Sequence, residues 1–234
     1  MKYKILIFQI FFITLALKSH MLTYSDTLMY YGTQLYQAKD LIQAKEKLDS
    51  CIFLNPNNDE CKYYRAKIEF DMKSYQRASI MFKNVLVLQE NDASSWHMLG
   101  LCFTNLKHYD SAEFCFKNAV RLDSRRSEFY ANWGNNQFIR GNPVHAEQLY
   151  STAILLDDKK AQYYVNRAEV RAQLGSKEDA QIDLKQALSI DPSNAMAQKN
   201  LAEQTSWDKK WIYIVGLGFL LFFSLFLFLR SKKQ

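Results

Sequence analysis

The sequence predicts an all-α repeat protein that carries an apolar helix near its C-terminus. Glycine and proline are scarce, at 7 and 3 of 234 residues, and both residue types punctuate turns and strands. Between residues 25 and 194, a pattern of small and apolar residues recurs every 34 residues. Periods of about 20–50 residues indicate stacked supersecondary units. The third observation is an apolar run over residues 211–229 that contains no charge.

That run is long enough to cross a membrane. At ~1.5 Å per residue its helix would be about 28 Å long, close to the ~30 Å hydrocarbon core. Trp211 and Tyr213 lie at one end, where aromatic belts occur, and the basic tail 230–234 follows the other end. We therefore expect a single transmembrane helix over 211–229. A buried core helix of the same apolarity is the less favoured interpretation.

The N-terminus resembles an export signal in its pattern. Two lysines precede an apolar run over residues 5–17, which is short for a span and typical of a signal-peptide core. Residues 1–19 are therefore predicted to be a signal peptide. Because Leu17 is a mediocre residue for a cleavage site, retention as an uncleaved anchor stays open.

Charge distribution argues against nucleic acid as a partner. The net charge of +6 comes from basic residues at the two chain ends, where no acidic residue occurs. Without these six, the 30 basic residues are reduced to 24, which equals the 24 acidic ones. Phosphate binding needs clustered positive charge on the folded domain. The six are Lys2, Lys4, Lys18, Arg230, Lys232 and Lys233.

The repeat keeps one register without gaps over five blocks, namely 25–58, 59–92, 93–126, 127–160 and 161–194. Position 8 of each block is small, position 20 is alanine, position 24 is large and apolar, and position 27 is small or apolar. Small residues at 8 and 20 let two antiparallel helices approach closely, and positions 20, 24 and 27 share one helix face. Gly141 and Gly175 occupy position 15, in the turn within a pair.

These residues resemble the tetratricopeptide-repeat (TPR) family over 170 residues in five units. The third unit, with Trp96, Gly100 and Phe116, is most similar to the family pattern. The second departs most, because Lys62, Arg65 and Glu69 stand at normally apolar positions, where Arg65 and Glu69 have the spacing of an ion pair. The resemblance implies a right-handed superhelical solenoid of five helix-turn-helix repeats. Residues 195–210 are predicted to form the capping helix.

In the family, positions 2, 5, 6, 9, 12 and 13 of the first helices line a groove that binds polypeptides. Position 6 is asparagine three times, at Asn132, Asn166 and Asn200. Because each amide offers donors and an acceptor, a row of them would hold an extended backbone. Solvation or capping is the alternative role for these residues. The N-terminal half of the groove is aromatic instead, and such residues suit an adaptable binding surface or pack into neighbouring repeats. Its predicted binding residues are Tyr30, Tyr36, Tyr63, Tyr64, Phe70 and His97.

The four cysteines do not form a metal or redox motif, because no CxxC spacing occurs. Burial as small apolar residues is their simplest role. Cys51 ends one helix and Cys61 opens the next, so a disulfide between them is possible if the repeats are exported. We expect no metal and no cofactor.

No catalytic motif is present either, so we expect no enzyme activity. The predicted function is a membrane-anchored scaffold or receptor that binds polypeptide partners on the extracytoplasmic side, in a periplasm or lumen, and assists complex assembly. We expect no small-molecule substrate. Two alternatives stay open, namely a tail-anchored adaptor or import-type receptor that faces the cytosol, and a non-catalytic subunit of an enzyme complex.

Overall fold

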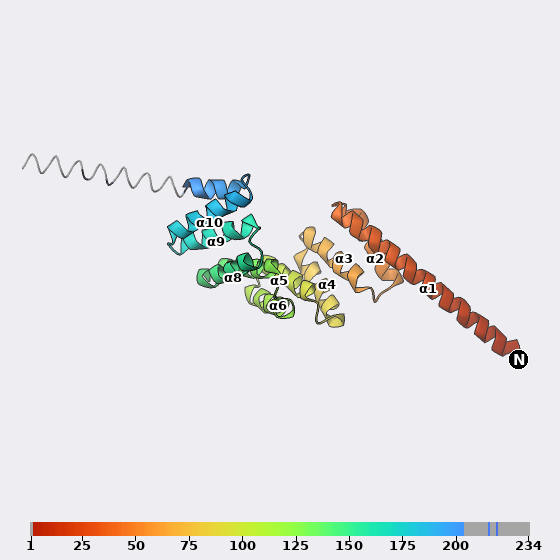
Figure 1. The fold of residues 1–234 in the computed structure, drawn as a ribbon. Coiled ribbons are helices and arrows are strands. Elements are labelled where there is room, and N and C mark those ends of the chain that lie inside the picture. Colours follow the sequence, from red (N-terminus) through yellow and green to blue (C-terminus); the bar gives the residue numbers. More distant parts are fainter. Residues whose placement is uncertain (1, 204–214, 216–218, 220–234) are drawn as a thin grey trace, which may run out of the picture. The chain divides into compact units, whose positions relative to one another are not determined.

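A computed structural model describes residues 2–203, together with 215 and 219. It divides into two compact units, Met1–Asn136 and Gln137–Gln234, each considered by itself below. Within the described residues the secondary structure is helical, and the prediction of an all-α repeat fold is confirmed. The N-terminal unit contains α1 (Lys2–Gln37), α2 (Leu41–Leu54), α3 (Asp59–Asp71), α4 (Tyr75–Leu88), α5 (Ala93–Asn105) and α6 (Tyr109–Leu122) (Figure 1).

Helix α7 (Ser127–Ile139) contains the boundary between the two units. The C-terminal unit continues with α8 (Pro143–Leu156), α9 (Ala161–Gln173), α10 (Lys177–Ile190) and a helical stretch over 195–203. The predicted membrane segment 211–229 lies outside the described residues except for Val215 and Phe219, as do residues 204–210 and the tail 230–234. Within the part that the structure describes, no helix is both long and apolar enough to cross a membrane.

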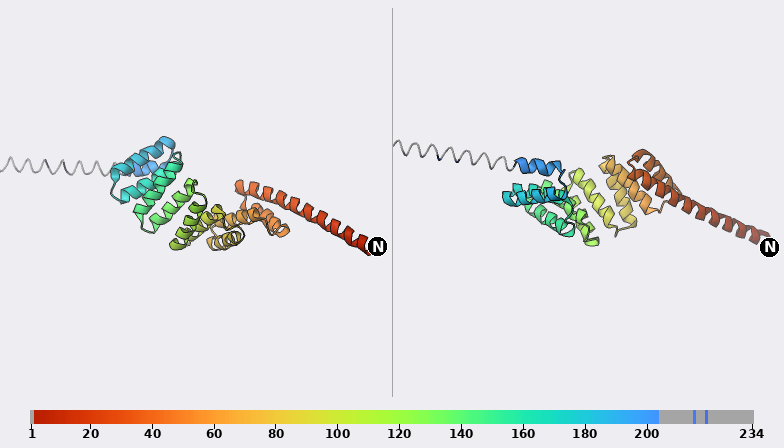
Figure 2. Two further views of the ribbon diagram at one scale, coloured as in Figure 1. Left: turned by 60° about the horizontal axis from the view of Figure 1, so that its bottom comes forward. Right: turned by 45° about the horizontal axis from the view of Figure 1, so that its top comes forward.

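Helix α1 is longer than the repeat pattern predicts. It runs without a break from Lys2 to Gln37, so residues 2–19 of the predicted signal segment and the first helix of the first repeat are one helix. Its C-terminal part packs on α2, with Ser25 and Leu28 buried. Both views in Figure 2 show the N-terminal part of α1 continuing beyond these paired helices.

In the first and third repeats, the two antiparallel helices are held in close contact at position 8. A Cβ atom on Gly100 would lie 2.8 Å from Cε1 of Phe116, and one on Gly32 would lie 2.8 Å from Cγ of Leu48. Real Cβ atoms do not approach that closely, so glycine is required for these helix separations. Phe116 and Leu48, at position 24, are both fully buried, as the repeat pattern predicts.

The turn within each pair uses one conformation at position 15. Gly141 and Gly175 have φ of +89° and +88°, which glycine adopts without steric cost. The first three repeats place lysines there, with φ between 61° and 65°. The same left-handed turn is thus built from two residue types. The lysines are Lys39, Lys73 and Lys107.

The first helices of successive repeats form one layer in the N-terminal unit. Helix α1 contacts α3, and α3 contacts α5, in addition to the second helices that pair with them. We call the surface that these first helices and the start of α7 share the first-helix face. It carries the groove positions of the repeat.

A disulfide joins Cys51 of α2 to Cys61 of α3, with Cα atoms 6.4 Å apart. It connects the second helix of the first repeat to the first helix of the second repeat. Both cysteines are fully buried, and the Ser25 hydroxyl of α1 lies 3.3 Å from the Cys51 sulfur. The other two cysteines, Cys102 and Cys115, are free and buried.

Charged side chains replace apolar ones at two places between helices. Arg65 Nη1 lies 2.7 Å from Glu69 Oε1, as their spacing predicts, and Arg65 Nε lies 2.6 Å from Asp49 Oδ1. In the C-terminal unit, the buried Asp183 accepts from Arg167 at 2.7 Å and from Arg171 at 2.9 Å. Arg171 also reaches Glu147 of α8 at 2.7 Å. Ion pairs therefore take the place of some apolar contacts between helices in these two repeats.

Candidate polypeptide-binding surface

Three tyrosines predicted to line the groove lie together on the first-helix face. Tyr36 comes from α1, whereas Tyr63 and Tyr64 are adjacent on α3. The Tyr64 ring centroid is 5.7 Å from that of Tyr36 and 5.6 Å from that of Tyr63, and both pairs meet edge to face. Such pairs stabilise each other beyond the area they bury. We call Tyr36, Tyr63 and Tyr64, together with Lys67, the tyrosine cluster.

Lys67 stands among these rings. Its ammonium nitrogen is 5.1 Å from the centroid of Tyr36, 5.6 Å from that of Tyr63 and 5.5 Å from that of Tyr64. These separations fall in the range of cation–π attraction. The side chain is half-buried, and no ion pair joins it to a carboxylate of the described residues. Burial lowers the pKa of Lys67.

Hydrogen bonding fixes the edge of the cluster. The Tyr36 hydroxyl donates to Asp71 Oδ2 at 2.6 Å, and this bond ties the end of α1 to the end of α3. Burial, followed by the bond to Asp71, raises the pKa of Tyr36. Burial also raises the pKa of Tyr63 to about 12. Both phenols are therefore neutral hydrogen-bonding groups at any physiological pH.

His97 lies beneath the face rather than on it. It is 8% exposed, and its ring stacks on Phe129 of α7 with centroids 4.5 Å apart. Burial lowers the pKa of His97 to about 4, so the imidazole is neutral near pH 7. Asn132 Nδ2 lies 2.9 Å from Nε2 of this ring. A neutral imidazole accepts that hydrogen bond and fixes the orientation of the Asn132 amide.

The predicted asparagine row is divided between the two units. Asn132 lies in the N-terminal unit, and its Oδ1 accepts from Asn135 at 3.4 Å. Asn166 and Asn200 lie in the C-terminal unit, where Asn166 Oδ1 accepts from Gln162 at 2.6 Å. All three side chains are half-buried. The amides of Asn132 and Asn166 thus already make hydrogen bonds within the protein.

Asn200 lines a cavity of about 630 Å³ between α9, α10 and residues 195–203. Its floor is apolar, with Ala168 and Leu184, and its rim is charged, with Glu169 and Lys199. Asn200 and Glu169 occupy groove positions of their repeats. The C-terminal unit therefore offers an apolar hollow with polar edges, whereas the N-terminal unit offers an aromatic surface.

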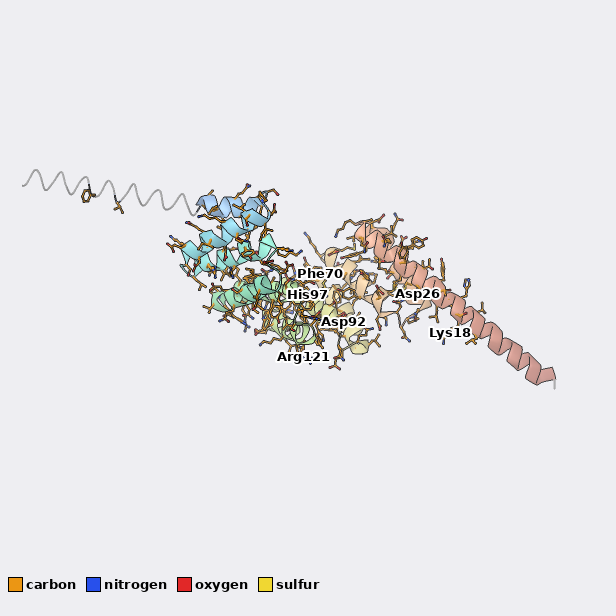
Figure 3. All side chains as sticks on the ribbon, in the orientation of Figure 1. Lys18, Asp26, Phe70, Asp92, His97 and Arg121 are labelled. Carbon is orange, nitrogen blue, oxygen red and sulfur yellow. A yellow bond between two sulfur atoms is a disulfide. The ribbon has the colours of Figure 1, made fainter. Side chains whose placement is uncertain are left out.

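Two predicted groove residues lie outside the tyrosine cluster. Tyr30 is 58% exposed and meets the neighbouring Tyr31 edge to face at 5.6 Å. Phe70 is half-buried and packs on Tyr75, at the start of α4, at 5.3 Å. Figure 3 labels Phe70 and His97 on their helices.

Lys67 and Asp71 are members of this site that sequence reasoning missed. Both stand at groove positions, 9 and 13 of the second repeat, so reading these positions along the register would have found them. Within the described residues, no group of three or more histidine, cysteine, aspartate or glutamate side chains is arranged to hold a metal ion.

Comparison with known proteins supports the repeat assignment. Residues 93–126 and 161–194 match the family model of the tetratricopeptide repeat. These are the third and fifth blocks of the 34-residue register. No curated protein matches the sequence.

Several solved structures share the fold at low identity. YrrB, described as a TPR protein with an unusual peptide-binding site, is 20% identical with a TM-score of 0.60, covering 74% of this chain and 89% of its own. A TPR protein of Thermus thermophilus is 18% identical with a TM-score of 0.65, covering 77% and 98%. PilF of Pseudomonas aeruginosa is 15% identical with a TM-score of 0.70, covering 82% and 93%. The matched repeats and the shared fold are those of the tetratricopeptide-repeat family.

Proposed function

We propose that the protein is a membrane-anchored scaffold that binds polypeptide partners on its first-helix face and assists their assembly on the extracytoplasmic side of a membrane. The observation that carries the proposal is the tyrosine cluster, in which three rings from two repeats surround Lys67 at 5.1–5.6 Å. YrrB, which has a similar fold, has a peptide-binding site.

The chemistry of the cluster suits a polypeptide. Tyrosine supplies a large, rigid contact area with a polar tip and loses little conformational entropy on binding. The rings of the cluster already contact one another edge to face and approach Lys67 in the free protein, so a partner has little side-chain ordering to impose. Aromatic residues are enriched among those that dominate binding energy.

The asparagine amides would add contacts to a backbone. Asn132 donates one N–H to His97, which leaves a second N–H on the same nitrogen. Because His97 and Asn135 hold the amide in place, binding to that N–H would require little rearrangement. In the C-terminal unit, Asn200 would act at the edge of its apolar cavity.

The disulfide supports the extracytoplasmic location. Disulfides form and persist in exported proteins and are rare in the reducing cytosol. Cys51 and Cys61 are joined across two repeats, and Cys61 shares helix α3 with two tyrosines of the tyrosine cluster. The apolar segments at residues 5–17 and 211–229 supply the proposed export signal and anchor. Tethering would raise the local concentration of whatever the face binds.

A co-purification experiment tests the binding surface. The full chain is expressed in its source cells with a double substitution, Tyr64→Ala with Lys67→Gln, and partners captured on the wild type are quantified. We expect the variant to lose about 2 kcal/mol of binding or more, roughly thirtyfold in affinity. The control Phe53→Ala removes an aromatic side chain that is 83% exposed on α2. Equal capture by the double variant and the wild type would refute the proposal.

A separate measurement tests the location. Protease added outside sealed membrane vesicles of known orientation should reach the repeats only from the extracytoplasmic side. Non-reducing mass spectrometry of the same material should recover Cys51 and Cys61 as one linked peptide. Cleavage from the cytosolic side together with free thiols would instead favour a cytosol-facing adaptor. A co-purifying enzyme would favour the non-catalytic subunit.

A further inference from the structure

A second surface, separate from the tyrosine cluster, is hollow. A cavity of about 680 Å³ lies among α4, α5 and α6 of the N-terminal unit. Its lining is mostly apolar and aromatic. The apolar residues that matter here are Leu86, Val87, Trp96, Leu99, Phe103 and Phe114.

The cavity is a crevice between two second helices. Helix α5 contacts both α4 and α6 and forms the floor with Leu99 and Phe103. Trp96 meets Phe114 edge to face at 5.8 Å. Its ring nitrogen donates to the Glu90 carbonyl at 2.8 Å. The aromatic wall is therefore fixed by the protein itself.

In two other repeats, an arginine at an equivalent position makes an ion pair across the junction with the preceding second helix. In the second repeat, Arg65 occupies the position of Leu99 and bonds to Asp49 on α2 at 2.6 Å. In the fifth repeat, Arg171 occupies the position of Phe103 and bonds to Glu147 on α8 at 2.7 Å. Each arginine bridges its own first helix to the preceding second helix. The third repeat has no such side chain at these two positions, and its crevice stays open.

The α4 side of this crevice carries a positive charge where the equivalent position of α2 carries a negative one. Lys83 of α4 stands one repeat after Asp49, at the same position of the 34-residue register. Lys83 borders the cavity, and its ammonium lies 5.2 Å from the ring centroid of Phe103. No ion pair joins it to a carboxylate of the described residues. Asp110, at the start of α6, also borders the cavity, so the positive charge belongs to the α4 side. An occupant complementary to this crevice thus combines apolar side chains with a negative charge placed on the α4 side.

The exposed rim favours a polypeptide over a small molecule. Val87 is 81% exposed and Phe114 is 60% exposed, and these two side chains stand on opposite walls. Small-molecule pockets bury most of the ligand within the protein, whereas this opening leaves its apolar rim in water. A partner surface that covers both walls would remove that apolar area from water.

We propose that the crevice among α4, α5 and α6 binds a segment of a partner protein in which apolar side chains adjoin an aspartate or glutamate. The apolar side chains rest on Leu99 and Phe103, and the carboxylate meets Lys83. This site is independent of the first-helix face, so one chain can hold two polypeptides at once.

Peptide selection on the full-length chain in lipid nanodiscs tests the proposal. A displayed library of random twelve-residue peptides is selected on the wild type, and enriched peptides are synthesised with a fluorescent label. Affinities are measured by fluorescence polarisation against Phe114→Asp and Lys83→Glu. Each variant has a control at the same register position in the fifth repeat. Ile182→Asp is the control for Phe114→Asp, and Lys185→Glu is the control for Lys83→Glu.

We expect enriched peptides with apolar residues beside an acidic one. Phe114→Asp should weaken their binding about tenfold or more. The wild type should prefer each acidic peptide over the version in which its acidic residue is replaced by lysine. Lys83→Glu should instead prefer the lysine version, by about fivefold. The two controls and the Tyr64→Ala, Lys67→Gln variant should stay within about twofold of the wild type. Failure to enrich any peptide that depends on Phe114 would overturn the proposal. So would Phe114-dependent peptides that lack acidic residues.

Discussion

The third and fifth repeats use the same backbone pattern with opposite chemistry. At positions 7, 11 and 23, the third repeat has Leu99, Phe103 and Cys115, where the fifth has Arg167, Arg171 and Asp183. The first set is part of the apolar packing around α5. The second is a network in which one buried carboxylate holds two arginines.

The difference indicates that the residues that pair the two helices of a repeat are not the residues that determine whether the neighbouring crevice is apolar or charged. Both repeats keep a small residue at position 8 opposite a buried apolar residue at position 24. That contact sets the helix pair, and the neighbouring positions are then free to be apolar or charged. Where they are charged, the protein closes its own crevice, and where they are apolar, the crevice is left open to a partner.

The largest expected effect comes from breaking the network of the fifth repeat. Asp183→Cys introduces the third-repeat residue and leaves two arginines without their shared carboxylate. Removing one member of a buried ion pair costs about 3–5 kcal/mol. Hydrogen exchange followed by mass spectrometry should show lost protection across α9 and α10. Lys185→Ala, an exposed change on the same helix, serves as the control.

Completing the exchange sharpens the comparison. The triple variant Arg167→Leu, Arg171→Phe, Asp183→Cys gives the fifth repeat all three residues of the third. Because replacing a buried ion network by packed apolar residues is often neutral or stabilising, protection should return to within about 1 kcal/mol of the wild type. A triple variant as unstable as Asp183→Cys alone would show that the two chemistries are not interchangeable.

Acid should weaken the third repeat through His97. Burial lowers the pKa of His97 in the folded protein to about 4, from 6.5. Between these two pH values, His97 is protonated in the unfolded chain and neutral in the folded protein. Stability is therefore lost as pH falls through this window. We expect His97 to account for about 2 kcal/mol of the loss between pH 7.5 and 5. Urea unfolding at both pH values measures it.

The fifth repeat supplies the matched substitution, because position 5 is the buried Val165 there. His97→Val should flatten the pH dependence while leaving the repeat folded at pH 7.5. If the variant and the wild type lose equal stability between the two pH values, the protonation of His97 does not contribute.

The smallest expected effect concerns the turns. Lys107 adopts φ +63° where the fifth repeat has Gly175 at +88°. A left-handed conformation is strained for residues other than glycine, so Lys107→Gly should raise stability by about 0.5–1 kcal/mol. Gly175→Lys should lower it by a similar amount. Thermal unfolding of both variants checks the signs, and a stability loss from Lys107→Gly would contradict the turn argument.

The repeat fold could be predicted because its signals are local. Small residues at positions 8 and 20 and a large one at 24 describe a helix pair on their own, and Gly100 against Phe116 shows that contact directly. The spacing of Arg65 and Glu69 likewise reports a contact within one helix. Such features need only the helical period and the register.

Other features could not be predicted in this way because they join different helices or defy residue preference. Lys67 approaches Tyr36 from another repeat, and His97 is buried by Phe129, also from another repeat. Nothing in the pattern marks lysine as the residue of a left-handed turn, since its preference is helical. The pairing of Cys51 with Cys61 was one possibility, and burial of all four cysteines as free thiols was the other.

The unbroken α1 has a mechanical consequence. Its 36 residues give a rod of about 54 Å at 1.5 Å per residue, and its last turns are tied to α2 and α3 by packing and by the bond from Tyr36 to Asp71. A continuous helix has no hinge at which rotation is absorbed. Where the N-terminal end of this helix is retained, torsion or tilt imposed on it would be transmitted along the rod to the ring of Tyr36 in the tyrosine cluster.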